Sequence, residues 1–329
     1  ILWVRNGFTV SVDGTALTPN SAPSADDTDV AYTINTNATN AITIVASNGT
    51  TTYTITCPHY TATATGTNPV AVNGPILTIR KFPSEAITME QLIHIGSVTD
   101  EAANFLKKLV AAKYNIFVSG GTGAGKTTFL NALSNYIPKG ERLITIEDNA
   151  ELQIQGVQNL VRLEARGPNA EGEGAVTIRD LIKSALRMRP DRIVVGEVRG
   201  EETVDMISSA MLNGHSGSMS TGHANNPTDM LHRLETMMLM GIDLPLQAIQ
   251  RQVASALDII IHLGRLRDKT RKVLQIVEVE GYEDGKIQTK VLYEFKEEGM
   301  KNGKIQGCLM KKNEITNKEK LLAAGYHTN

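Results

Sequence analysis

The segment 115–137 constrains the fold more than any other part of the chain; it reads NIFVSGGTGAGKTTFLNALSNYI. Its first residues form an apolar run that predicts a buried strand, a glycine-rich turn follows, and the residues after the turn have helical spacing. The turn fits G-x-x-x-x-G-K-[ST], with its fixed positions at Gly120, Gly125, Lys126 and Thr127. A strand before this turn and a helix after it predict an α/β domain with a P-loop.

The P-loop is predicted to bind the phosphates of a nucleotide. Glycine lets the backbone curl so that successive N–H groups point into one concavity, with no Cβ atom in the way of the phosphate oxygens. We expect Lys126 to reach the β- and γ-phosphates and the Thr127 hydroxyl to bind Mg²⁺. The predicted nucleotide-binding residues are Gly120, Gly121, Thr122, Gly123, Ala124, Gly125, Lys126, Thr127 and Thr128. GTPases carry an N-K-x-D loop that reads guanine, and the nearest match in this chain, NKEK at 317–320, lacks the aspartate. The sequence therefore favours ATP over GTP as the nucleotide.

Acidic residues follow two further predicted strands. RLITIED places Glu147 and Asp148 at the end of one, and RPDRIVVGEVRG places Glu197 at the end of another. Ligands of doubly wound sheets gather at the carboxyl ends of the strands, so these acids are predicted to lie beside the P-loop. There a carboxylate can orient or deprotonate an attacking water, or hold the hydration shell of Mg²⁺. The alternative for each acid is to cap the helix that follows it.

The residue before Glu197 bears on the metal. Gly196 stands there, where many P-loop ATPases carry an aspartate, so a direct aspartate ligand from this strand is missing. Thr127, phosphate oxygens and waters held by Glu147 or Asp148 would then complete the metal shell. The predicted metal residues are therefore Thr127 and Asp148.

Two histidines bracket the predicted short strand SGSMST, and a helix is predicted to begin near Pro227. His215 and His223 are eight positions apart, which matches no common zinc motif and disfavours a metal site there. A histidine at a strand end can donate a hydrogen bond to a γ-phosphate and so report its presence. This role is predicted for His223, and the alternative for both histidines is a local hydrogen bond.

Residues 1–69 differ in composition from the rest of the chain. They contain one basic residue, Arg5, of the 33 in the chain, no glutamate, and many threonines and asparagines. FTVSV, VAYTI, AITIVAS and TTYTIT alternate apolar and small polar residues, which predicts short strands, with disorder as the alternative. From Thr99, TDEAANFLKKLVAAK predicts a helix with acids near its start.

From about Gly74 onward the chain resembles the secretion ATPases of type II and type IV machinery, and most of all the CpaF/TadA-like ATPases of Flp (tight adherence) pili. The segments that carry the likeness, in chain order, are GPILTIRKFP, NIFVSGGTGAGKTTFLNALS, ITIEDNAELQI, NLVRLEARGPNAEGEGAVTIRDLIKSALRMRPDRIVVGEVRGEE, GHSGSMSTGHANN, RLETMMLMGIDLPL and HLGRLRDKTRKV. The resemblance implies a RecA-like ATPase domain, assembled as a homo-hexamer at the cytoplasmic face of the inner membrane. It also implies an integral-membrane platform protein as partner, and indirect action on a pilin or a secreted protein.

The resemblance assigns roles to several residues. By this likeness RIVVGEVRG is an atypical Walker B segment with Glu197 as catalytic glutamate, ITIEDNAEL an aspartate box, and STGHAN a histidine box around His223. Lys126 and Glu147 are also expected to act in catalysis. The family further implies arginine fingers: Arg80 is the first candidate, with Arg162 and Arg166 as alternatives, and the opposing reading makes Arg80 an exposed strand residue.

The predicted organisation has four parts. Residues 1–73 form a β-type, atypical or truncated N-terminal region, 74–98 the last strand of that domain and a linker, 99–297 the RecA-like P-loop ATPase domain, and 298–329 a C-terminal tail. No apolar run approaches the roughly 18 residues of a spanning helix, so a cytoplasmic protein, peripheral to the membrane, is expected.

Three rival functions remain at this point. A RecA-like motor acting on nucleic acid shares the P-loop, but a formal charge of −2 and 5% aromatic residues disfavour nucleic acid as a partner. A pilus-retraction ATPase is a narrower rival. The last is a non-enzymatic chain with an adhesin-like N-terminal module, against which the intact Lys126, Thr127 and Glu197 argue.

Overall fold

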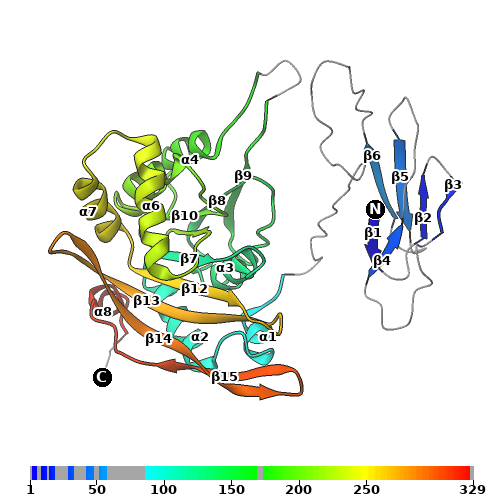
Figure 1. Ribbon diagram of the computed structural model, residues 1–329. Helices are drawn as coiled ribbons and strands as arrows, with labels where there is room; N and C mark the ends of the chain where they lie inside the picture. Colours follow the sequence, from blue (N-terminus) through cyan, green and yellow to red (C-terminus); the bar gives the residue numbers. More distant parts are fainter. Residues whose placement is uncertain are drawn as a thin grey trace. The chain divides into compact units, whose positions relative to one another are not determined.

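The computed structural model describes residues 2–5, 9–12, 15–18, 29–32, 42–47, 52–57, 86–168 and 173–326. The chain divides into two compact units, Ile1–Phe82 and Pro83–Asn329 (Figure 1). The division falls inside the segment 74–98 that the sequence predicts to join the two parts. Residues 58–85, which contain the predicted strand around Arg80, lie outside the described residues.

The described part of the first unit consists of short antiparallel strands. They are β1 (Leu2–Arg5), β2 (Thr9–Val12), β3 (Thr15–Ala16), β4 (Asp29–Tyr32), β5 (Ile42–Ser47) and β6 (Thr52–Cys57). β1 pairs with β4, and the other strands form a sheet in the order β3-β2-β5-β6. The strands predicted from the alternating Thr-rich segments are therefore confirmed.

The second unit is organised around one sheet of nine strands, in the order β15-β14-β13-β12-β7-β11-β10-β8-β9. The strands are β7 (Ile116–Gly120), β8 (Arg142–Glu147), β9 (Asn159–Glu164), β10 (Arg192–Val195), β11 (Met219–Gly222), β12 (Ile259–Arg265), β13 (Arg271–Glu283), β14 (Lys286–Lys301) and β15 (Lys304–Lys311). The pairs from β12 through β9 are parallel, and β13 to β15 are antiparallel additions.

The strand register brings the carboxyl ends of the central strands together. Gly222 on β11 lies opposite Ser119 on β7, and Ser220 on β11 lies opposite Val195 on β10. The P-loop and the residues after β10 and β11 therefore share one edge of the sheet. The predicted α/β class of the P-loop domain and the β-rich character of the N-terminal region are confirmed by these two units.

Helices cover both faces of this sheet. They are α1 (Met89–His94), α2 (Asp100–Ala111), α3 (Lys126–Ser134), α4 (Ile178–Leu186), α5 (Glu202–Val204), a π-helix (Asp205–Met211), α6 (Pro227–Gly241), α7 (Leu246–Ala256) and α8 (Glu319–Ala323). Side-chain caps fix several helix starts: Thr99 accepts a hydrogen bond from Ala102 N, and Asn226 from Asp229 N. The helices predicted from Thr99 and near Pro227 are confirmed.

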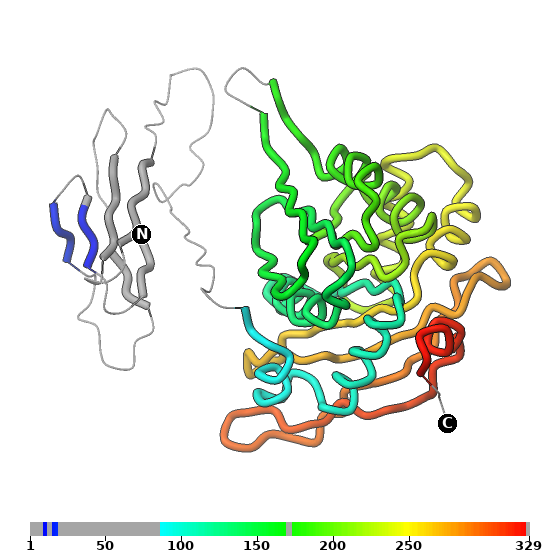
Figure 2. Tube along the Cα trace, turned by 180° about the vertical axis from the view of Figure 1, so that it is seen from behind, coloured from blue at the N-terminus to red at the C-terminus, as the bar shows by residue number. Residues whose placement is uncertain are grey.

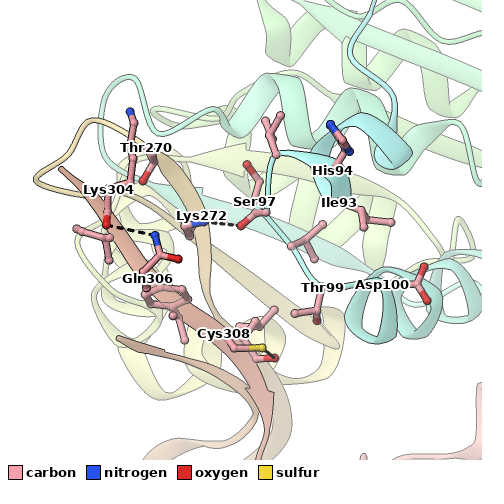
Figure 3. Close-up of a pocket in the computed structure, with 17 residues that line it drawn as sticks. Ile93, His94, Ser97, Thr99, Asp100, Thr270, Lys272, Lys304, Gln306 and Cys308 are labelled. Atoms are coloured by element: carbon pink, nitrogen blue, oxygen red, sulfur yellow. Dashed lines mark hydrogen bonds between the residues drawn. The ribbon is translucent and has the colours of Figure 1, made fainter. Parts of the chain in front are cut away.

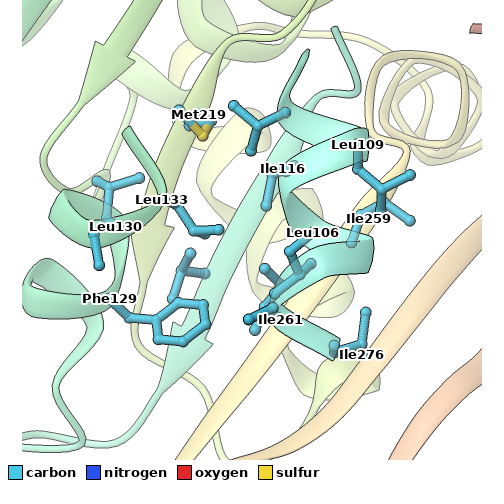
Figure 4. Close-up of a cluster of buried hydrophobic side chains, with 14 of the residues drawn as sticks. Leu106, Leu109, Ile116, Phe129, Leu130, Leu133, Met219, Ile259, Ile261 and Ile276 are labelled. Carbon is cyan, nitrogen blue, oxygen red and sulfur yellow. The ribbon is translucent and has the colours of Figure 1, made fainter. Parts of the chain in front are cut away.

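Two apolar clusters hold these helices to the sheet. One contains side chains of α1, α2 and α3, and the other those of α4, the π-helix, α6 and α7. Strand β7 contributes side chains to both clusters, because successive side chains of a strand point to opposite faces of the sheet. Ile116 and Val118 belong to the first cluster and Phe117 to the second. Figure 4 shows Phe129 of α3 beside Ile261 of β12 in the first cluster. The core thus fixes both sides of the strand that leads into the P-loop.

The methionines of α6 lie mostly in the core. Met230, Met237 and Met238 are at most 2% exposed, which is typical of a periodic apolar face, whereas Leu239 and Met240 at the end of the helix are exposed.

The chain beyond residue 297 continues the sheet. The predicted boundary at 297/298 falls inside β14, which turns back at Asn302 and Gly303 into β15. In Figure 1 this long hairpin lies below α1 and α2. Tyr114 Oη donates a hydrogen bond of 2.5 Å to Asn317 O, and Leu321 of α8 is buried, so α8 and the residues just before it pack against the domain.

An arm extends from the edge strand β9. Residues 165–168 leave the sheet and residues 173–177 return to α4, and the two legs are joined by a bridge between Arg166 and Val176. Figure 2 shows both legs reaching beyond the helices of the unit. Within the described ranges, no helix has the length and apolar character needed to cross a membrane.

Candidate nucleotide site

The P-loop has a backbone that favours glycine at three positions. Gly120, Gly123 and Gly125 have φ angles of +156°, +72° and +93°, and Gly125 precedes the first turn of α3. A Cβ atom at Gly120 would lie 2.4 Å from Leu263 O, whereas at Gly121 or Gly123 it would meet nothing within 4 Å. The loop therefore packs tightly against β12 on one side and borders open space on the other, as a phosphate cradle requires.

Lys126 lies within this loop and is only 8% exposed. Its Nζ atom donates to Gly121 O at 3.3 Å and lies 3.1 Å from His223 Nδ1. Burial lowers the pKa of Lys126, and the nearby Glu197 carboxylate opposes this shift. A buried ammonium whose partners are one carbonyl and one imidazole is well placed to bind a phosphate oxygen.

His223 connects Lys126 to Glu197. Its pKa is lowered, mainly by burial and further by the charges of Lys126 and Arg199, while Glu197 has the opposite effect. A neutral ring that accepts a hydrogen bond from the Lys126 ammonium at Nδ1 carries its own proton on Nε2. Nε2 lies 2.9 Å from Glu197 Oε1, although the alignment is not that of a hydrogen bond. The structure thus brings together the three residues Lys126, His223 and Glu197, which three separate motifs predicted.

Sequence reasoning missed one residue of this cluster, Arg199. Its Nη2 and Nε atoms donate to Glu197 Oε2 at 2.7 and 3.0 Å, and its Nη1 lies 3.3 Å from Asp148 Oδ2. Glu197 Oε1, in contrast, is buried and has no hydrogen-bond partner among the described residues. The signal available in the sequence was a cation two residues after the predicted catalytic glutamate, in GEVRG.

Glu147 lies at the same edge of the sheet but bonds to backbone. Its Oε1 accepts hydrogen bonds from Glu151 N at 3.0 Å and Leu152 N at 2.8 Å, and it is 4% exposed. Burial raises its pKa, and the two backbone donors oppose this shift. Glu147 therefore anchors the loop that follows β8, and its predicted part in catalysis stays a prediction.

The residues present fit a magnesium ion bound chiefly by phosphate and water. Among the residues that the structure describes, no three His, Cys, Asp or Glu side chains gather into a metal cluster. Thr127, in the first turn of α3, is half-buried next to Lys126. Asp148 is 46% exposed and pairs with Arg199. A hydroxyl, a carboxylate and open space agree with the preference of Mg²⁺ for few protein ligands and several waters.

The remaining predicted residues lie apart from this cluster or outside the description. Arg80 belongs to the part of the chain that the structure does not describe. Arg162 Nη2 donates to Leu152 O at 2.8 Å, and Arg166 donates to Gly174 O on the opposite leg of the arm. His215 Nδ1 lies 2.8 Å from Pro190 O, which is the local contact considered as its alternative.

A separate pocket of about 610 Å³ lies between the α1–α2 connection and β15. Figure 3 shows Lys272, whose Nζ donates to Gly96 O at 2.7 Å, and Gln306, which donates to Lys304 O at 3.3 Å. None of the predicted site residues lines this pocket.

Comparison with known proteins identifies the family. The family model described as "Type II/IV secretion system protein" matches residues 51–317. A putative conjugal transfer protein of Mycobacterium tuberculosis is 40% identical over 220 residues, which cover 67% of this chain and 61% of that protein. The conjugal transfer protein TrbB of Rhizobium radiobacter is 33% identical over 71% of this chain and 69% of its own length.

Comparison with solved structures finds a further protein to which the chain is similar. The VirB11 ATPase of the Brucella suis type IV secretion system matches with a TM-score of 0.49 and 29% identity, over 74% of each chain. By the sequence matches, the chain belongs to the type II/IV secretion system protein family.

Proposed function

We propose that this protein hydrolyses ATP and that the hydrolysis drives the transport of protein subunits by a membrane-bound secretion or pilus machine. One observation carries the proposal: the P-loop Lys126 and the strand-end Glu197 lie on either side of His223, 3.1 and 2.9 Å from its two ring nitrogens. A phosphate-binding cation and a buried carboxylate at one edge of the sheet are the groups that attack on a γ-phosphate needs.

In this proposal the chain's own groups divide the work. The N–H groups of residues 120–128 bind phosphate oxygens, and Lys126 leaves Gly121 O and His223 to bind the γ-phosphate. Glu197 Oε1, which lacks a hydrogen bond, orients the attacking water and accepts its proton. His223, once free of Lys126, reports the γ-phosphate. Thr127 would hold Mg²⁺, which supplies charge neutralisation on the phosphates. For Asp148, a part in the metal's water shell is the alternative to its contact with Arg199.

The work that hydrolysis drives is proposed from the family. We propose a homo-hexamer at the inner face of the cytoplasmic membrane that acts through an integral-membrane platform protein, with Flp or type IV pilus assembly, or protein export, as its output. The relatives carry names from conjugal transfer and, for PtlH of Bordetella pertussis, from type IV secretion, which supports a transport role. The alternatives are pilus retraction and a motor on nucleic acid.

The test is Mg²⁺-dependent ATP hydrolysis by the full chain over a range of protein concentrations. We expect activity that rises more than linearly with concentration and is lost in Glu197→Gln. The matched control is Glu164→Gln, which changes an exposed carboxylate at the end of β9 and should retain activity. Equal activity in both variants would contradict the proposal, and stimulation by added DNA would favour the nucleic-acid alternative.

A further inference from the structure

Arg199 contacts two acidic residues of the candidate site, Glu197 and Asp148. It follows β10 by a few residues, and its backbone N donates to Glu202 Oε1 at 2.6 Å, as does Gly200 N at 3.0 Å. The first turn of α5 therefore fixes the backbone from which the Arg199 side chain returns toward Glu197.

The guanidinium engages only one oxygen of Glu197. Two donors, at 2.7 and 3.0 Å, meet at Oε2, while Nη1 lies 3.3 Å from Asp148 Oδ2. The rigid planar fork of arginine fixes direction as well as distance, so it sets the rotation of the carboxylate about its last bond. Oε1 is consequently held in the buried position next to His223, without a hydrogen bond of its own.

We infer that Arg199 is a positioning residue for Glu197, and that Asp148 acts by holding Arg199 rather than by direct contact with the reacting atoms. The inference rests on the proposed ATP hydrolysis. In chemical terms, Arg199 keeps Glu197 Oε1 pointed at the attacking water. A carboxylate that rotated freely would have this orientation only part of the time.

Stability does not account for these contacts. The Arg199 side chain is 62% exposed and that of Asp148 is 46% exposed, and exposed ion pairs contribute little to folding. The Glu197 side chain, in contrast, is 17% exposed. The effect of Arg199 should therefore appear in turnover rather than in the unfolding temperature or in nucleotide affinity.

The experiment compares Arg199→Ala, Arg199→Lys and Asp148→Asn in the full chain. We expect Arg199→Ala to lower kcat about 10- to 100-fold, since misplacing a catalytic group by about 1 Å has effects of this size. The affinity for a fluorescent ATP analogue should change less than about threefold, because Arg199 makes no hydrogen bond or ion pair with the P-loop among the described residues. Lysine, which lacks the fork, should restore activity only in part. Arg187→Ala, at an exposed arginine after α4, is the control.

The double variant of Asp148 and Arg199 tests whether Asp148 acts through Arg199. If Asp148 acts through Arg199, Asp148→Asn lowers kcat less than Arg199→Ala, and the double variant is no slower than Arg199→Ala alone. An increase of kcat in Arg199→Ala would identify Arg199 as a restraint and overturn the inference, as would unchanged kcat or multiplicative effects in the double variant. Equal hydrolysis by the wild type and Glu197→Gln would refute the proposed function itself, and the inference with it.

Discussion

We predict that removing Glu141 destabilises the second unit more than removing Arg192, although the two side chains form one ion pair. Arg192 opens strand β10, which leads to Glu197, and its side chain is 0% exposed. It donates to Glu141 at 2.5 and 2.9 Å and to Val110 O at 2.6 Å. The Glu141 side chain is 13% exposed and also lies 3.9 Å from Lys113 Nζ.

The difference follows from which charge is left behind. Glu141→Met leaves a fully buried guanidinium with Val110 O as its remaining acceptor, and an uncompensated buried charge costs about 3–5 kcal/mol of unfolding free energy. Arg192→Met leaves a carboxylate that reaches solvent and Lys113, while Val110 O keeps its backbone hydrogen bond from Lys113 N at 3.2 Å, so the expected cost is about 1–3 kcal/mol. The variant with both methionines should lose less than the sum of the two single changes, because it buries no charge.

The assay is urea unfolding of the full chain followed by circular dichroism. Lys312→Met serves as control, since Lys312 and its partner Glu294 are 42% and 44% exposed and their pair should contribute less than about 1 kcal/mol. An Arg192→Met variant that loses as much stability as Glu141→Met would refute the reasoning. So would effects that add in the double variant to within about 0.5 kcal/mol.

Three other changes test the site and its surroundings. Gly120→Ala should cost about 1–3 kcal/mol, because its Cβ would lie 2.4 Å from a carbonyl oxygen of β12, whereas Gly121→Ala, with open space around its Cβ, should melt close to the wild type in calorimetry. Glu147→Gln keeps an oxygen that can accept both backbone hydrogen bonds, so it should weaken the loop by about 1 kcal/mol and retain measurable ATP hydrolysis; complete loss would show a chemical role. Burial lowers the pKa of both His223 and His262 in the folded chain. As the pH falls, the two imidazoles are therefore protonated in the unfolded chain first, and the free energy of unfolding should decrease below about pH 6.5. A variant with both His223→Asn and His262→Asn that shows the same pH slope would contradict this.

The parts of the fold that the sequence predicts are those with strong local signals. The P-loop strand is an apolar run that leads into a glycine-rich turn, and the helix from Thr99 combines helical apolar spacing with a cap. The convergence of Lys126, Glu197 and His223 follows from a general property of parallel sheets, in which the carboxyl ends of the strands share one edge. Neither inference requires knowledge of a specific side-chain contact.

The antiparallel extension was open to prediction and was missed. The segments YEDGKI and MKNGKI contain Asp-Gly and Asn-Gly, and each pair is flanked by residues that could form strands. Both pairs are strong signals for a two-residue hairpin turn. In the structure, Asp284 and Asn302 have φ angles of +50° and +51°, each followed by a glycine with positive φ. The predicted boundary at 297/298 does not take this turn chemistry into account, and it falls within β14.

The contact of Arg199 with Asp148 and the pair of Arg192 with Glu141 could not be found from local patterns. Asp148 and Arg199 are 51 positions apart, as are Glu141 and Arg192, and each pair forms only because β8 and β10 lie side by side. Such contacts depend on register and on rotamers, which the period of apolar residues does not specify.

The three acids at the sheet edge illustrate what the structure adds to the motif. Spacing treats Glu147, Asp148 and Glu197 alike, since each ends a strand beside the P-loop. Their partners separate them: Glu147 Oε1 is occupied by two backbone N–H groups, and Asp148 Oδ2 by Arg199. Only Glu197 combines burial with an oxygen that has no hydrogen bond among the described residues. The loss of ATP hydrolysis should therefore be greatest for the glutamine substitution at Glu197, smaller for asparagine at Asp148 and least for glutamine at Glu147, an order that capping of helices by all three acids would not produce.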